Sequence, residues 1–148
     1  MNKNFVFIFT YLLFLFSSIK LYSQNAEGYS ETGFKKFANQ DYIGAIQDYT
    51  SAIELSPKND SYYIIRGYSN FKLSRFNESI EDFNKAIEIS PNFYSYYLNR
   101  AYVKKYIGDK EGACFDYKKY MEISGLSSNE EFKKFCEELK EEPKMKSP

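Results

Sequence analysis

Two cysteines are the side chains best suited to covalent chemistry in this 148-residue chain. Cys114 and Cys136 stand 22 positions apart, whereas enzymes that exchange disulfides usually carry both thiols in one short motif. The chain also has no histidine that could activate a thiol. We therefore expect a structural role, either as one disulfide or as two buried thiols, and not redox catalysis.

The remaining residues do not form the patterns that acid–base catalysis or metal binding usually requires. Without histidine, the usual proton shuttle, nucleophile activation and histidine metal ligation are absent. The adjacent acidic pairs are Glu130 with Glu131, Glu137 with Glu138, and Glu141 with Glu142. Adjacent residues of a helix point in different directions, so these pairs are typical of a solvated surface. With no phosphate-binding glycine loop or ligand-spaced cysteine cluster, the sequence predicts no enzyme activity, no catalytic residues, no metal and no cofactor.

Residues 1–23 are typical of a secretory signal peptide. An apolar run from Phe5 to Phe16 follows a short basic start and is shorter than the roughly 20 apolar residues of a membrane-spanning helix. Cleavage is expected near Ser23–Gln24, and no cysteine stands there to be acylated. The sequence thus predicts an exported protein, periplasmic or secreted, with no membrane insertion after cleavage.

The charge balance argues against nucleic acid as a partner. The 20 basic and 20 acidic side chains of the full chain become 18 and 20 once the signal peptide, which carries two lysines and no acid, is removed. A nucleic-acid-binding chain normally carries a basic excess.

The rest of the chain repeats itself every 34 residues. The positions that coincide are Tyr29, Tyr63 and Tyr97; Gly33, Gly67 and Ala101; Tyr49, Phe83 and Tyr117; Ala52 and Ala86; and Pro57 and Pro91. Each unit is typical of two helices with a short break between them, and proline stops the second helix. The small residues let the two backbones approach closely, while the aromatic rings fill the space beside them.

This combination of small, aromatic and proline positions resembles the tetratricopeptide repeat (TPR) family over about residues 26–124. The resemblance implies an all-α fold, a right-handed α-solenoid of three helix-turn-helix repeats plus a C-terminal capping helix. The expected segments are a signal peptide (1–23), repeats over 26–59, 60–93 and 94–126, a capping helix over 128–141 and a disordered tail over 142–148. The third repeat departs from the pattern at Tyr120 and Gly125, as a terminal repeat commonly does.

The expected capping helix explains the spacing of the two cysteines. A capping box is available at Ser127 or Ser128, and apolar residues follow on one stripe: Phe132, Phe135, Cys136 and Leu139. In an antiparallel helix pair turning near Gly125, Cys114 and Cys136 are each eleven residues from the turn and meet at the same height. We therefore predict a Cys114–Cys136 disulfide, with two buried thiols as the alternative.

Charged residues also recur with the 34-residue period. Asp48, Asp82 and Asp116 fall on the second helices, while Arg66 and Arg100 fall on the first helices of the second and third repeats. Because the first repeat has Thr32 in place of an arginine, we predict pairing between repeats, Asp48 with Arg66 and Asp82 with Arg100.

The resemblance also implies where a partner would lie, because first helices line the concave face in this family. The residues predicted to contact a partner are Phe34, Phe37, Tyr68, Phe71, Lys72, Tyr102, Lys105 and Tyr106. Aromatic side chains suit recognition of a peptide, although aromatics at helical spacing are also typical of packing. Positions that grip a terminal carboxylate in some family members hold Ser30, Phe34, Ile65, Ser95 and Asn99, so chaperone tails are not expected.

The function predicted from these observations is a non-catalytic scaffold or adaptor that binds a peptide or protein segment in an aromatic groove. The alternative is a structural subunit of an envelope complex assembled through the repeat faces.

Overall fold

The computed structural model describes residues 26–126 and 130–141, all helices and short connections. The helices are the first helix (described over 26–38), α2 (Tyr42–Leu55), α3 (Asp60–Lys72), α4 (Phe76–Ile89), α5 (Tyr94–Tyr106), α6 (Lys110–Ser124) and α7 (Glu130–Glu141). The predicted signal peptide, the capping box at Ser127 or Ser128 and the predicted tail lie outside the described residues. Within the described ranges, no helix has both the length and the apolar character needed to cross a membrane.

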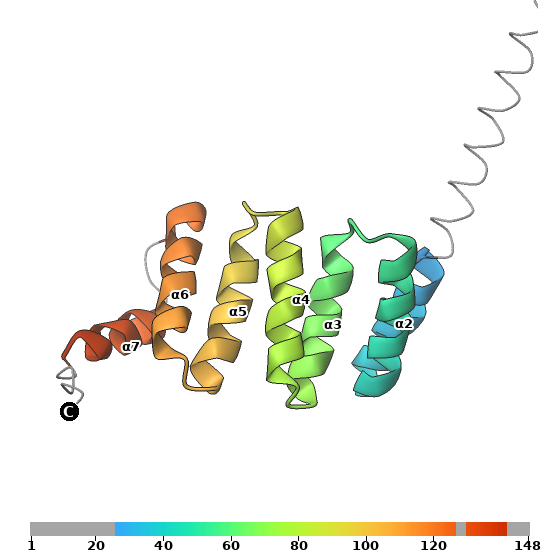
Figure 1. Cartoon of the computed structure of the whole chain (residues 1–148), viewed down its shortest axis with the longest axis horizontal. Helices are drawn as coiled ribbons and strands as arrows, with labels where there is room; N and C mark the ends of the chain where they lie inside the picture. Colours follow the sequence, from blue (N-terminus) through green and yellow to red (C-terminus); the bar gives the residue numbers. More distant parts are fainter. Residues whose placement is uncertain (1–25, 127–129, 142–148) are drawn as a thin grey trace, which may run out of the picture.

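The helices stand side by side in one row, two to each 34-residue period (Figure 1). From α2 onward, each helix packs chiefly against its neighbours in the chain. The all-α solenoid expected from the sequence is confirmed. α7 lies at the foot of α6 and runs at a steep angle to it (Figure 1), so the expected antiparallel alignment of these two helices is wrong.

The turn inside each repeat has the same construction. Gln40, Ser74 and Gly108 occupy the same repeat position, and all three have positive φ angles, 65°, 59° and 82°. Only glycine adopts this left-handed conformation without steric cost. In the first and third repeats an aspartate follows and caps the second helix: Asp41 accepts from the Gly44 backbone N–H at 2.9 Å and Asp109 from that of Gly112 at 3.0 Å.

Small residues allow the helices of each repeat to approach closely. A Cβ atom added at Gly67 would lie 2.9 Å from the Phe83 ring, and one at Gly33 would lie 3.1 Å from the Tyr49 ring. Ala101 stands at the same repeat position and is fully buried. The repeated small residues are therefore explained by the packing of first helix against second.

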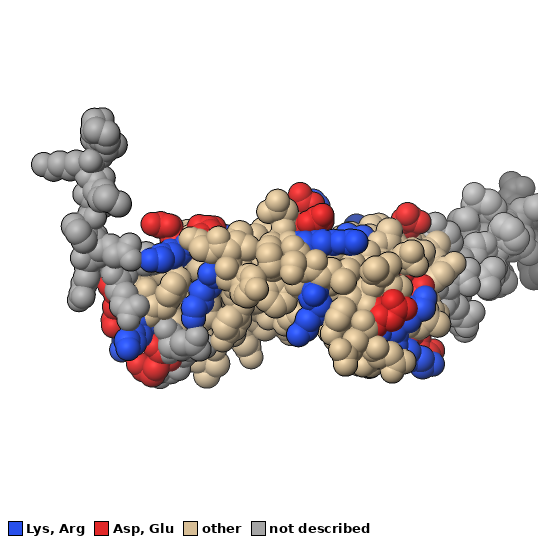
Figure 2. Space-filling model, turned by 90° about the horizontal axis from the view of Figure 1, so that it is seen from below, with Lys and Arg blue, Asp and Glu red and all other residues tan. Residues whose placement is uncertain are grey.

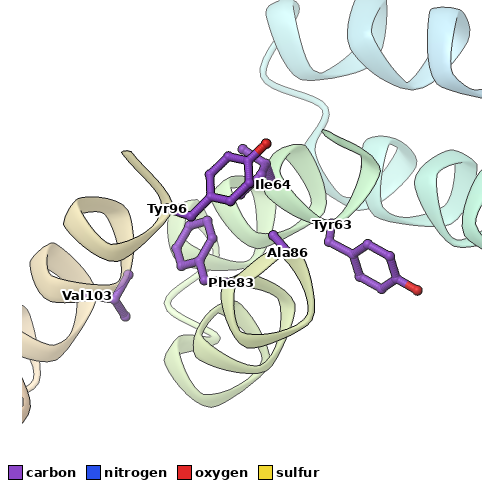
Figure 3. Close-up of a cluster of buried hydrophobic side chains, with 6 residues drawn as sticks. All are labelled: Tyr63, Ile64, Phe83, Ala86, Tyr96 and Val103. Carbon is purple, nitrogen blue, oxygen red and sulfur yellow. The ribbon is translucent and has the colours of Figure 1, made fainter. Parts of the chain in front are cut away.

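The core between the second and third repeats draws on three helices. Its buried members are Tyr63, Ile64, Phe83, Ala86, Tyr96 and Val103, from α3, α4 and α5 (Figure 3). Phe83 is completely buried. Since α5 belongs to the next repeat, this cluster joins neighbouring repeats as well as the helices within one.

The predicted inter-repeat ion pairs are corrected by the structure. Arg66 pairs with Asp82 of its own repeat, with Nη2 2.6 Å from Oδ1, and Asp48 pairs with Lys36, also of its own repeat, at 2.8 Å. Lys36 supplies the cation that the first repeat lacks at Thr32, whose hydroxyl instead donates to carbonyl oxygens of its own helix.

The third repeat follows the same rule with a second cation. Arg100 Nη2 lies 2.6 Å from Asp116 Oδ1, and Lys104 Nζ lies 2.9 Å from Asp116 Oδ2. The arginines do reach the preceding repeat, but through neutral acceptors: Arg66 donates to Thr50 Oγ1 at 3.1 Å, and Arg100 donates to Asn84 Oδ1 at 2.5 Å.

Candidate functional site

A pocket of about 590 Å³ opens between α3 and α5, above the buried face of α4. We call it the central pocket. Its lining residues are Tyr68, Phe71, Lys72, Phe83, Asn99, Tyr102, Val103, Lys105 and Tyr106. Both first helices contribute because they are neighbours in the solenoid, and α4 supplies the base. Its volume falls within the range of about 300–1,000 Å³ typical of ligand sites.

The aromatic wall of the pocket is held by ring contacts. Phe71 of α3 and Tyr106 of α5 meet edge to face, with centroids 5.6 Å apart. Phe76, at the start of α4, lies 5.0 Å from the same Tyr106 ring and 5.8 Å from Phe71. Tyr106 nevertheless keeps 68% of its surface exposed, so its ring is both positioned by neighbours and accessible to a partner.

The base of the pocket is apolar and closely packed. Phe83 and Val103 belong to the buried core, and Tyr68 packs edge-on against Phe83 at 5.5 Å. Burial raises the pKa of the Tyr68 hydroxyl above its ordinary value. That phenol is therefore neutral at physiological pH and can serve as a hydrogen-bond donor beside an apolar surface.

The C-terminal side of the pocket is bordered by α7. Phe132 of this helix is fully buried and lies edge-on to Tyr102, with centroids 4.9 Å apart. Lys105 Nζ lies 5.1 Å from the ring centroids of both Phe132 and Phe135, within cation–π range. Two pocket residues, Tyr102 and Lys105, are thus positioned by the capping helix.

The structure brings most of the predicted partner-contact residues together. Tyr68, Phe71, Lys72, Tyr102, Lys105 and Tyr106 line the central pocket. Phe34 and Phe37 do not; Phe34 is exposed on the first helix, and Phe37 packs against Tyr42 of the same repeat at 5.7 Å.

Sequence reasoning missed three lining residues, Phe83, Asn99 and Val103. The 34-residue period predicts Phe83 only as a packing aromatic, and the structure places this buried ring beneath the pocket. Val103 and Asn99 lie on the same helix as predicted residues, so the helical spacing of α5 could have found them.

Among residues 26–126 and 130–141, no group of three or more cysteine, aspartate or glutamate side chains is arranged to hold a metal ion. The Sγ atoms of Cys114 and Cys136 lie 2.00 Å apart, and their Cα atoms are 5.6 Å apart. Cys114 is buried, so this pair sits inside the junction between α6 and α7.

The row of paired helices, with its close-packed small residues and a pocket on the first helices, defines a helical-repeat protein of the α-solenoid class. Residues 60–93, one full period, match the family model described as tetratricopeptide repeat. The chain therefore carries a tetratricopeptide repeat over these residues.

Solved structures of TPR domains share the fold. The first TPR domain of Spaghetti (RPAP3), bound to the HSP90 peptide SRMEEVD, is 26% identical, with 80% of this chain and 95% of that chain covered and a TM-score of 0.72. The TPR2B domain of yeast Sti1, in complex with pHsp70, is 27% identical, with coverages of 81% and 99% and a TM-score of 0.69. The first TPR domain of human RPAP3 is 25% identical, with coverages of 80% and 94% and a TM-score of 0.70. No curated protein sequence matches the chain significantly.

Proposed function

We propose that this protein is a non-catalytic interaction adaptor that binds a peptide or protein segment in the central pocket. The observation that carries the proposal is the pocket itself, an apolar cavity with an accessible aromatic wall. Aromatic side chains supply large contact area at little conformational cost and dominate the energetics of many interfaces. Seen from below the row of helices, uncharged side chains cover most of the middle of the molecule, with charged side chains of both signs scattered among them (Figure 2).

Relatives of similar fold support a peptide as partner. Two of the structures above are described as complexes with an HSP90 peptide and with pHsp70. In this chain, the positions that resemble a terminal-carboxylate grip hold Ser30, Phe34, Ile65, Ser95 and Asn99. None of these is a cation, so we expect the pocket to recognise side chains in preference to a chain terminus.

We also propose that the protein acts outside the cytoplasm, in the periplasm or beyond, as an exported chain with an oxidised Cys114–Cys136 pair. The apolar segment over 1–23 and the position of the two sulfur atoms support this proposal. N-terminal sequencing of the protein from fractionated cells tests the export. A mature chain that begins near Gln24 is expected, and an uncleaved cytoplasmic chain would contradict it.

Site-specific photo-crosslinking in the cells that make the protein tests the adaptor role. A photoreactive phenylalanine analogue replaces Tyr106 in one variant and Phe115, on α6, in a second. The two positions are matched in exposure, 68% and 58%, but only Tyr106 lines the central pocket. We expect a protein adduct from position 106 that is absent from position 115.

Two outcomes would contradict the proposal. The same adducts from both positions would mean that the pocket is not the contact surface. A stable oligomer in light scattering, with position 106 crosslinked to a second copy, would favour the structural-subunit alternative.

A further inference from the structure

The contacts of α7 with the third repeat show what kind of segment the surface of that repeat accepts. α7 presents two phenylalanines three positions apart to the third repeat. Phe132 stacks on Tyr117 at 5.1 Å and meets Tyr102 edge to face at 4.9 Å. Phe135 lies 6.0 Å from Phe132, and the same Lys105 ammonium reaches both rings at 5.1 Å. A tyrosine and a lysine on α5 therefore hold a pair of phenylalanines.

The central pocket continues this surface by one repeat. Tyr102 and Lys105 belong both to the seat of α7 and to the pocket lining. On the other side of the pocket, Tyr68 occupies the repeat position of Tyr102, and Lys72 supplies another ammonium group. A phenylalanine pair entering the pocket would thus meet the same types of group that α7 already meets.

The charges of the pocket indicate the second property of the partner. The charged residues that line it are Lys72 and Lys105, and no carboxylate is among the lining residues. α7 itself begins with Glu130 and Glu131, directly before Phe132. An acidic segment is therefore electrostatically complementary to the pocket, and opposite charge speeds and orients encounter.

We propose that the central pocket binds an acidic amphipathic helix of a partner protein, with two phenylalanines three residues apart, so that α7 is a built-in copy of the recognised motif. This inference rests on the proposed adaptor function. Helix-in-groove recognition reads anchors at positions i and i+3 or i+4, which is the spacing of Phe132 and Phe135. The pocket would receive the partner's two rings between Tyr68 and Tyr106.

A synthetic peptide taken from the chain itself provides the probe. It has the sequence of residues 130–141 with Cys136→Ser, which prevents thiol exchange, and carries a fluorescent label at its N-terminus. Binding to the purified oxidised protein is followed by fluorescence anisotropy. We expect saturable binding that weakens at least tenfold when the peptide carries Phe132→Ala and Phe135→Ala. We expect a similar weakening when the protein carries Tyr106→Ala, and no change with Phe115→Ala.

Three results would overturn the inference. They are the absence of saturable binding at millimolar peptide, equal binding of the peptide without phenylalanines, and equal binding by the Tyr106→Ala protein. The last result, combined with faster amide exchange in α7, would mean that the peptide displaces the protein's own cap. Concentration-dependent dimerisation that buries Tyr106 would identify the occupant as a second copy.

The two proposals can fail separately. If position 106 captures a protein in cells while the peptide does not bind, the adaptor function stands and the phenylalanine motif is wrong. If position 106 gives no protein adduct and the peptide does not bind, both proposals are wrong.

Discussion

The guanidinium group of Arg66 binds both carboxylate oxygens of Asp82, sixteen positions further along the same repeat. Nε lies 3.1 Å from each oxygen and Nη2 lies 2.6 Å from Oδ1. Asn70 donates a further hydrogen bond to Oδ2 at 3.0 Å. The remaining nitrogen, Nη1, donates to Thr50 in the preceding repeat. One arginine therefore neutralises a buried carboxylate and ties two repeats together.

Arg66→Met is expected to lower the free energy of unfolding by about 3–5 kcal/mol. The reason is that the Asp82 side chain is only 4% exposed and would keep its charge in the interior without its cation. Burial already raises the pKa of Asp82, and Arg66 and Asn70 only partly oppose that effect. Urea denaturation of the variant and the parent measures the loss.

The exposed pair Lys85–Glu88 provides the matched control. Its two side chains are 57% and 62% exposed, so Lys85→Met should change the free energy of unfolding far less than Arg66→Met does. In Arg66→Met, the pKa of Asp82 rises further above its unfolded value, so its protonation favours the folded state. The loss of unfolding free energy in Arg66→Met should therefore be smallest at a pH below the pKa of Asp82 in the unfolded chain. It should grow as the pH rises through the pKa of Asp82 in the folded variant. Equal losses in the two variants, or a deficit independent of pH, would contradict the role given to Arg66.

The sequence predicted the architecture better than the polar contacts. Small residues and aromatics at a spacing of 34 identify the repeats, because close packing of two helices tolerates few residue types at such positions. The polar partners of the repeated aspartates could not be predicted in the same way. Lys36, Asn70 and Lys104 share one repeat position and all contact the aspartate of their own repeat, yet their types differ.

The pocket was predicted in part for a similar reason. Helical spacing identified one face of the first helices. Which of those residues enclose a cavity depends on the base beneath them, where Phe83 of α4 and Val103 of α5 meet. Phe37 lies outside the pocket lining and packs against Tyr42, a contact that depends on the turn between two helices.

Ser79→Ala is expected to stabilise the protein by about 1–2 kcal/mol. Ser79 is fully buried, and its hydroxyl has no hydrogen-bond partner among the described residues. The other two repeats hold Ala45 and Ala113 at this position, both fully buried, which shows that the site accommodates a methyl group. Thermal and urea denaturation measure the gain. The reverse change, Ala45→Ser, should destabilise, and a loss of stability in Ser79→Ala would mean that the hydroxyl is satisfied.

The cysteine pair is expected to be oxidised and to hold α7 on the third repeat. Mass spectrometry of the protein from its own compartment should find no free thiol, and two free thiols would contradict the disulfide. Cys114 and Cys136 are 22 residues apart, for which the chain-entropy model gives about 3 kcal/mol. Reduction should therefore speed amide exchange in α7. Exchange in α3, which belongs to the preceding repeat and carries neither cysteine, should not change and serves as the internal control.

Two buried tyrosines should make the protein sensitive to alkaline pH. Burial raises the pKa of Tyr49 to about 12, with a smaller effect from Tyr62. Burial, followed by the charge and hydrogen bond of Asp60, raises that of Tyr96 to about 12. The ordinary value is 10.0, so the unfolded chain loses these protons first. Their contribution to stability is full below about pH 10 and is lost as the pH rises towards about 12.

Denaturant midpoints measured from neutral pH to pH 12, alongside the ultraviolet absorbance of tyrosinate, test this expectation. The midpoint should fall above about pH 10, and the last tyrosines should ionise only as the protein unfolds. Tyr49→Phe removes one titrating group and should make the fall of the denaturant midpoint with pH less steep. Tyr29→Phe, at an exposed position, should leave that fall unchanged. If Tyr49→Phe follows the same curve as the parent, the alkaline transition arises elsewhere, because a phenyl ring at this buried position carries no proton to lose.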